Sequence, residues 1–235
     1  MKSEGFRIMS SRKTAITVGV LFIIGTVAGV LSVLFTGPIL DDPDYLTRVT
    51  ANQNQIITGA LLVLLMGFAL AMIPVMMFPI LRKYNEALAL GAIVFRGVLE
   101  AVTYLAIVIS WLFLLTLSRE YIKAGAPDAS SFQILGTVLL EADDWIAQIL
   151  AIVFSIGALA IYYLFYQSKL IPRWLSIWGL IGAPLYLAAA LLAMFGIVSE
   201  ILMAPLALQE MILAVWLIVK GFNSSENISG IAKQI

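Results

Sequence analysis

Residues Ile56–Leu81 read IITGALLVLLMGFALAMIPVMMFPIL, a run of 26 residues without a charged side chain. A helix of about 20 apolar residues, rising about 1.5 Å per residue, crosses the roughly 30 Å hydrocarbon core of a lipid bilayer. This stretch is therefore long enough to span a membrane, and it sets the class of the whole chain.

Five other stretches meet the same test of length and hydropathy. The six predicted spans are residues 14–35, 56–81, 87–117, 145–166, 174–198 and 201–219. We interpret the first as a retained helix, because it is too long for a signal peptide and no small-residue cleavage site follows it. Only Ser199 and Glu200 separate the last two spans, which predicts a tight helical hairpin. No linker or second domain interrupts the sequence, so residues 1–235 are expected to form one integral membrane domain.

The composition agrees with a membrane protein and excludes several functions. Of 235 residues, 62% are hydrophobic and 12% are charged, against roughly a quarter charged in an ordinary soluble domain. The 14 basic and 14 acidic residues cancel, so nothing favours a nucleic-acid partner, and the lipid bilayer is the expected one. The absence of cysteine and histidine excludes disulfides, Cys/His metal sites and Cys–His or Ser–His catalytic pairs. We predict no metal, no cofactor and no catalytic residue.

The segments between the predicted spans divide their charges unequally between the two sides of the membrane. One side carries Lys2, Arg7, Arg12, Lys13, Arg82, Lys83, Lys169, Arg173, Lys220 and Lys233. The other side carries only Arg48, Arg119 and Lys123, together with most of the acidic residues. Cytoplasmic loops are enriched in Lys and Arg. Both termini are therefore predicted to be cytoplasmic.

Residues 129–140 form an outer segment that is longer than a simple connection needs. Phe132, Leu135 and Leu139 recur there at helical spacing, which predicts a short helix lying in the membrane interface. The simplest interpretation is that this helix covers the outer mouth of the bundle.

Three ionisable residues lie deep within the predicted spans. Arg96 lies about 14 Å and Glu100 about 20 Å inside the cytoplasmic edge of their span. Glu210 lies about 15 Å from Lys220 in the last span. An ionised side chain at such a depth costs roughly 2.5–3.5 kcal/mol on insertion scales. We therefore predict that all three face the bundle interior and approach one another within salt-bridge distance.

The charges of this group, which we call the charge cluster (Arg96, Glu100 and Glu210), do not balance. One guanidinium can serve two carboxylates through its five donors, but one positive and two negative charges leave a surplus. Either a cation is bound there or one carboxyl is protonated. Two interpretations remain open: a site that binds a ligand or a proton, and an interhelical clamp that fixes the register of two spans.

Further polar residues extend the candidate site. A stripe along the fourth span consists of Asp144, Gln148, Ser155 and Tyr162, at spacings of four and seven. If this face met that of Glu100, an acidic, amide-lined cavity would open outward; otherwise the stripe would make ordinary interhelical hydrogen bonds. Tyr104 and Gln209 flank the charge cluster on its own helices. The predicted ligand-binding residues are Arg96, Glu100, Tyr104, Gln148, Gln209 and Glu210.

Three segments together resemble a known family. They are Tyr163–Tyr186 (YLFYQSKLIPRWLSIWGLIGAPLY), Phe95–Glu100 (FRGVLE), and the helix from Glu210 to Val215–Asn223 (VWLIVKGFN). Over nearly the whole chain the sequence resembles the domain-of-unknown-function 4386 family of bacterial and archaeal membrane proteins. The resemblance implies a multi-pass protein of the cytoplasmic membrane of a prokaryote, and it brings no substrate or reaction. The matched motifs contain Arg96, Glu100, Pro172, Arg173 and Glu210.

Three functions from different classes remain. The first is a small carrier or permease component in which the charge cluster binds a small molecule or a coupling proton. Six helices are few for an independent transporter, so a homo-oligomer or a second membrane protein is expected. The second is a membrane-embedded partner or regulatory subunit in which the cluster is only a clamp. There the basic turn of Lys169, Pro172 and Arg173 would dock a cytoplasmic protein or anionic headgroups. An intramembrane enzyme ranks last, because carboxylates alone would have to act as acid and base.

Overall fold

The computed structural model describes residues 11–125 and 129–223. Within them six helices are long and apolar enough to cross a membrane, and no strand occurs, so the predicted all-α multi-pass bundle is confirmed. The elements are, in order, α1 (Ser11–Leu40), α2 (Tyr45–Ala51), α3 (Gln53–Leu81), α4 (Glu86–Ala92), the π-helical segment η1 (Ile93–Leu99), α5 (Glu100–Ala124), α6 (Ala129–Ser168), α7 (Arg173–Ala193), the short 3₁₀ turn η3 (Glu200–Leu202) and α8 (Ala204–Val219). α4, η1 and α5 follow one another without a break and form the third span.

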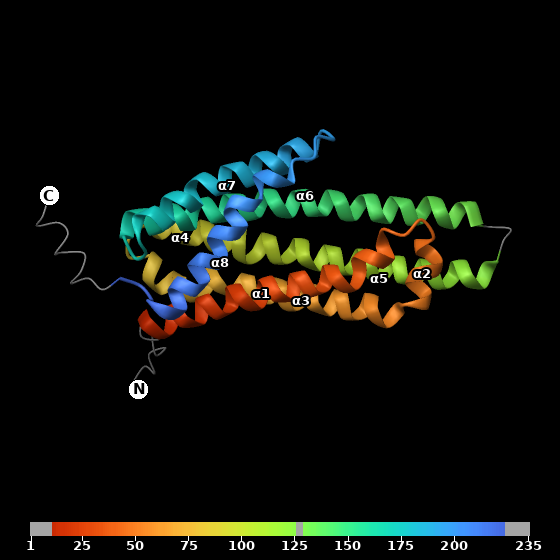
Figure 1. The fold of residues 1–235 in the computed structure, drawn as a ribbon, viewed down its shortest axis with the longest axis horizontal. Helices are drawn as coiled ribbons and strands as arrows, with labels where there is room; N and C mark the ends of the chain where they lie inside the picture. Colours follow the sequence, from red (N-terminus) through yellow and green to blue (C-terminus); the bar gives the residue numbers. More distant parts are fainter. Residues whose placement is uncertain (1–10, 126–128, 224–235) are drawn as a thin grey trace, which may run out of the picture.

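The six spans form a closed ring. Each span packs against the next one along the chain, and α8 returns to pack against α1 (Figure 1). Apolar side chains line the inside of the ring, and Arg96 is among the largest fully buried side chains. The ring therefore creates an interior that is largely shielded from lipid, where a polar group can be held.

The charges gather at the two ends of the ring. At the end where α1 begins and α8 ends lie Arg12, Lys13, Arg82, Lys83, Lys169, Arg173 and Lys220 (Figure 1). We call this the basic end, and the opposite end, with Asp41, Asp42, Asp44, Glu120 and Glu200, the acidic end. Three further basic residues of the sequence prediction, Lys2, Arg7 and Lys233, lie outside the described residues. The cytoplasmic position of the basic end stays a prediction.

The separate interfacial helix expected over residues 129–140 is wrong. These residues form the first turns of α6, which runs unbroken for 40 residues, or about 60 Å, twice the thickness of the hydrocarbon core. No proline interrupts the stretch, and α2 packs against it: the Tyr45 hydroxyl donates to the carbonyl of Gln133 at 3.2 Å, and the Tyr45 ring lies over Gly136. α6 is therefore one continuous helix, longer than a membrane span requires.

The last two spans are joined by a longer connection than predicted. α7 ends at Ala193 rather than at residue 198, and residues 194–199 lead to η3. The helix is closed by Gly196, whose positive φ of 79° suits glycine, and by the bond from the Ile197 amide to the Leu192 carbonyl at 3.0 Å. Because the residues that end α7 lie in an apolar stretch, hydropathy alone did not locate the end of the helix.

Gly157 sets how closely α6 approaches the third span. A Cβ at this position would lie 2.8 Å from both the backbone nitrogen and the Cβ of Arg96. Small residues at helix interfaces in membranes allow such close backbone approach. Gly157 thus positions the backbone that carries Arg96.

We expect Gly157→Ala to lower the free energy of unfolding by about 1–3 kcal/mol, because the new methyl group would push α6 away from the Arg96 backbone. The matched control is Gly91→Ala in α4, where an added Cβ meets nothing within 4 Å. That variant should change stability by less than about 1 kcal/mol, on the stabilising side. Unfolding by SDS in mixed micelles, followed by circular dichroism, measures both. Equal effects of the two substitutions would contradict the packing argument.

Candidate functional site

Arg96 lies in the middle of η1, the π-helical segment of the third span. π-helical turns are rare and occur frequently at functional sites. Against this segment lies α3, where the carbonyl of Ala71 and the ring of Pro74 are both 3.6 Å from the position of a Cβ on Gly97. η1 thus lies tightly between α3 and α6, and it directs the Arg96 side chain into the ring.

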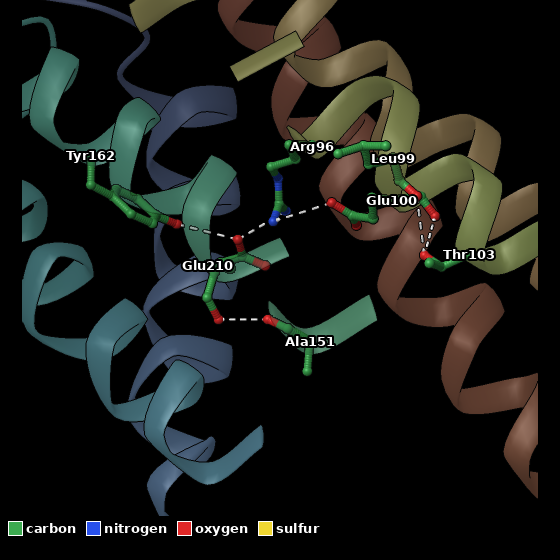
Figure 2. Close-up of polar contacts among 8 residues, drawn as sticks. Arg96, Leu99, Glu100, Thr103, Ala151, Tyr162 and Glu210 are labelled. Atoms are coloured by element: carbon green, nitrogen blue, oxygen red, sulfur yellow. Dashed lines mark hydrogen bonds and ion pairs between the residues drawn. The ribbon is translucent and has the colours of Figure 1, made fainter. Parts of the chain in front are cut away.

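The charge cluster assembles as predicted. Arg96 Nη2 lies 2.9 Å from Glu210 Oε1 on α8, and Arg96 Nη1 lies 3.9 Å from Glu100 Oε2 at the start of α5. Figure 2 shows the guanidinium between the two carboxylates. The Tyr162 hydroxyl on α6 donates a hydrogen bond of 3.3 Å to Glu210 Oε1. Side chains from three spans therefore meet at Glu210.

Two aromatic rings enclose the guanidinium. The Arg96 Cζ lies 4.3 Å from the ring centroid of Phe154 on α6 and 5.6 Å from that of Phe22 on α1. A desolvated guanidinium over an aromatic face gains about 2 kcal/mol or more from the ring quadrupole. Phe154 and Phe22 thus contact the Arg96 guanidinium where the two carboxylates do not.

The three side chains of the cluster differ in how much of their surface is exposed. The side chains of Arg96 and Glu100 are each 1% exposed, whereas that of Glu210 is 13% exposed. Tyr104 lies close enough to Glu100 to interact with its carboxylate, yet neither oxygen of Glu100 accepts a well-formed hydrogen bond. Glu210 is thus the accessible member, and Glu100 is a buried carboxylate held by a long ion pair.

A family described as Domain of unknown function (DUF4386) matches residues 17–221, a range that includes the whole charge cluster. The chain belongs to this family. No curated protein and no solved structure matches the chain. The family description names no substrate and no reaction for this DUF4386 protein.

Three predicted ligand-binding residues lie beside or away from the charge cluster of this DUF4386 protein. Tyr104 lies near Glu100, as described. Gln209 is fully buried and donates from Nε2 to the Leu175 carbonyl of α7 at 3.0 Å, so it joins α8 to α7. Gln148 lies further toward the acidic end. It lines a cavity against the end of α7 rather than against Glu100.

Sequence reasoning missed the partners that complete the cluster. Tyr162 was noticed only as one member of the polar stripe on α6, and the sequence analysis did not single out Phe154 or Phe22. Spacing on one helix shows which residues share a face, but not which helix that face meets. The described residues contain no group of three or more Asp, Glu, His or Cys side chains that would suit a metal ion.

The basic turn between α6 and α7 has a structural explanation. Lys169 has a positive φ of 56°, and its carbonyl accepts a 2.8 Å hydrogen bond from Asn223 Nδ2. Pro172 precedes the first residue of α7, and the Arg173 guanidinium lies 5.5 Å from the ring centroid of Tyr166. The bond from Asn223 joins the turn to the residues that follow α8, and the Arg173–Tyr166 contact joins α7 to α6. A partner that docks on this turn stays a prediction.

Replacing Arg96 with Met leaves two carboxylates in an apolar interior without their cation. We expect a loss of about 3–5 kcal/mol in the free energy of unfolding. The triple variant Arg96→Met/Glu100→Gln/Glu210→Gln removes all three charges and should recover most of that loss. SDS unfolding in mixed micelles provides the comparison. A triple variant as unstable as Arg96→Met would assign the loss to packing instead of charge.

Proposed function

We propose that this multi-pass membrane protein is a small carrier or permease component. Its charge cluster takes up a small ligand or a coupling proton near the middle of the membrane. The observation that carries the proposal is the unbalanced charge: one guanidinium faces two carboxylates. Intramembrane ionisable groups in a protein interior typically mark ligand or ion pathways.

The bonding of Glu100 supports a binding site over a purely structural clamp. Buried ion pairs stabilise a fold only when their geometry is good and further hydrogen bonds satisfy the remaining polar atoms. The Arg96–Glu100 separation of 3.9 Å is at the limit of an ion pair, and Arg96 Nη1 makes no hydrogen bond. Glu100 and Glu210 thus share Arg96 unequally. A carboxylate that is held this weakly by its cation is suited to bind and release a proton or a ligand.

The position of Glu210 supports the same proposal. Glu210, with its side chain 13% exposed, is the least buried member of the cluster, and the span that contains it and α8 is the least buried of the six. Among the spans, α8 packs chiefly against its two neighbours in the ring, α7 and α1. A tilt of α8 would therefore change access to Glu210 while the remaining three spans keep their packing against one another.

We place the protein in the cytoplasmic membrane of a prokaryote, on the basis of its family motifs and its basic end. We also propose that it acts as a homo-oligomer or beside another membrane protein, since one ring of six spans is small for an independent carrier.

A second candidate function is a membrane-embedded partner or regulatory subunit in which the cluster is only a clamp. The observation in its favour is the 2.9 Å ion pair between Arg96 and Glu210, which fastens the third span to the sixth across the ring. In this case the basic turn around Lys169 would be the surface that meets a cytoplasmic protein.

The two candidates predict different responses of the variant Glu210→Gln. Uptake of one proton would cancel the surplus charge of the wild-type cluster, so the wild-type melting temperature should be higher near pH 5 than near pH 9. Glu210→Gln already lacks that surplus and should show a flatter profile. The measurement is the melting temperature of the purified protein in detergent across this pH range.

Glu200→Gln is the matched control, because it makes the same chemical change at an exposed acid of the acidic end. Its pH profile should follow that of the wild type. A flat wild-type profile, together with a lower melting temperature for Glu210→Gln at every pH, would favour the clamp over the carrier.

A further inference from the structure

Glu100 is the acid of the charge cluster that its surroundings stabilise least as an anion. Its side chain is 1% exposed, and neither of its carboxylate oxygens has a hydrogen-bond partner among the residues that the structure describes. The Thr103 hydroxyl, less than one turn further along α5, donates instead to the Glu100 backbone carbonyl at 2.7 Å (Figure 2). Tyr104 lies beside Glu100 without a hydrogen bond of good geometry. Burial of a charge without hydrogen bonds is strongly unfavourable, so this position suits a neutral acid.

Glu210 holds a negative charge more firmly than Glu100 does. Its Oε1 lies 2.9 Å from Arg96 Nη2, whereas Glu100 Oε2 lies 3.9 Å from Arg96 Nη1. Because Coulomb energy varies inversely with distance, the shorter pair gains about a third more attraction. The same oxygen of Glu210 accepts a 3.3 Å hydrogen bond from the Tyr162 hydroxyl, and a hydrogen bond to a carboxylate stabilises its ionised form. Of the two acids, Glu210 is therefore the one suited to stay ionised.

The surroundings of the cluster supply no further positive charge. The ion pairs that the structure describes for Glu100 and Glu210 are both made by Arg96. The helices α1 and α3 carry no charged side chain over residues 14–40 and 56–81. The other titratable side chains that face the cluster are phenols, which are Tyr104 on α5, Tyr162 on α6 and Tyr186 on α7. One bound proton is therefore sufficient to make the cluster neutral.

We infer that Glu100 carries this proton, while Arg96 and Glu210 form the ionised pair. The proton lies on the acid that has the longer ion pair and no hydrogen bond, and the more accessible Glu210 is left to meet a ligand. The position of the proton follows from the contacts of Glu100 alone. Its role as the coupling proton of a carrier rests on the proposed function.

The test is NMR of the purified full-length protein in detergent near pH 7, with carbon-13 only at the side-chain carboxyl carbon of glutamate. The chemical shift of this carbon differs between the ionised and the protonated acid, so we expect one glutamate of the wild type to give a protonated signal. Glu100→Asp removes the labelled carboxyl but keeps an acid at this position, so the signal should disappear. Glu210→Asp is the matched control: it makes the same change at the other acid and should retain the signal.

The amide variants provide a second comparison that does not shorten either side chain. Glu100→Gln imitates the protonated acid and should keep the melting temperature near pH 7 close to that of the wild type. Glu210→Gln removes the acid of the ionised pair and should lower the melting temperature by several degrees. Equal losses in the two variants would contradict the assignment of the proton to Glu100.

Two outcomes of the NMR experiment would overturn the inference. A protonated signal that survives Glu100→Asp and disappears in Glu210→Asp would move the proton to Glu210, and the proposed carrier would stand. A wild type without a protonated glutamate would show that both acids are ionised. The melting profiles of wild type and Glu210→Gln between pH 5 and pH 9 would then decide separately whether the cluster still acts as a binding site.

Discussion

The guanidinium of Arg96 has to find its partners inside the protein, because its side chain is 1% exposed in a span that crosses the membrane. This constraint decides how the ring is assembled. Glu100 comes from the same span, but Glu210 comes from α8 at the far end of the chain. The ion pair to Glu210 joins the third span to α8, which itself packs against both α7 and α1. The buried charge thus makes the closure of the ring energetically important.

Close backbone contacts bring these groups within reach of one another. Gly157 lets α6 approach the backbone of Arg96. On the other face of α6, the Tyr162 ring packs against Gly179 of α7. A Cβ at Gly179 would lie 2.5 Å from atoms of this ring. The Tyr162 hydroxyl then reaches Glu210. Ordinary side chains at these two glycines would separate α6 from its neighbours and lengthen the bonds in the cluster. Packing and electrostatics therefore depend on the same helix, α6.

Hydropathy was sufficient to locate the six spans, because a bilayer requires long apolar helices. The cost of a charge in hydrocarbon was sufficient to predict that Arg96, Glu100 and Glu210 meet. Features that depend on which helices pack together could not be predicted from hydropathy or from the positions of charged residues. The π-helical segment η1 lies where α3 and α6 pack closely on it, and residues 129–140 of α6 contact both α5 and Tyr45 of α2. The aromatic partners Phe22 and Phe154 carry no polar signal, so sequence alone could not distinguish them from other lipid-compatible residues.

A clamp and a binding site need not be alternatives for the same three residues. In the proposed carrier, the Arg96–Glu210 ion pair holds α8 against the third span while Glu210 is ionised. A cation or proton that neutralises Glu210 removes the attraction that Arg96 exerts on it, and the guanidinium then has Glu100, at 3.9 Å, as its remaining acid. Glu100 thus serves as the alternative ion-pair partner of Arg96. The guanidinium then keeps an acidic partner in the apolar interior when Glu210 is neutral. In the proposed carrier, such an exchange of partners would account for one cation placed between two acids, whereas a purely structural clamp would need only one acid.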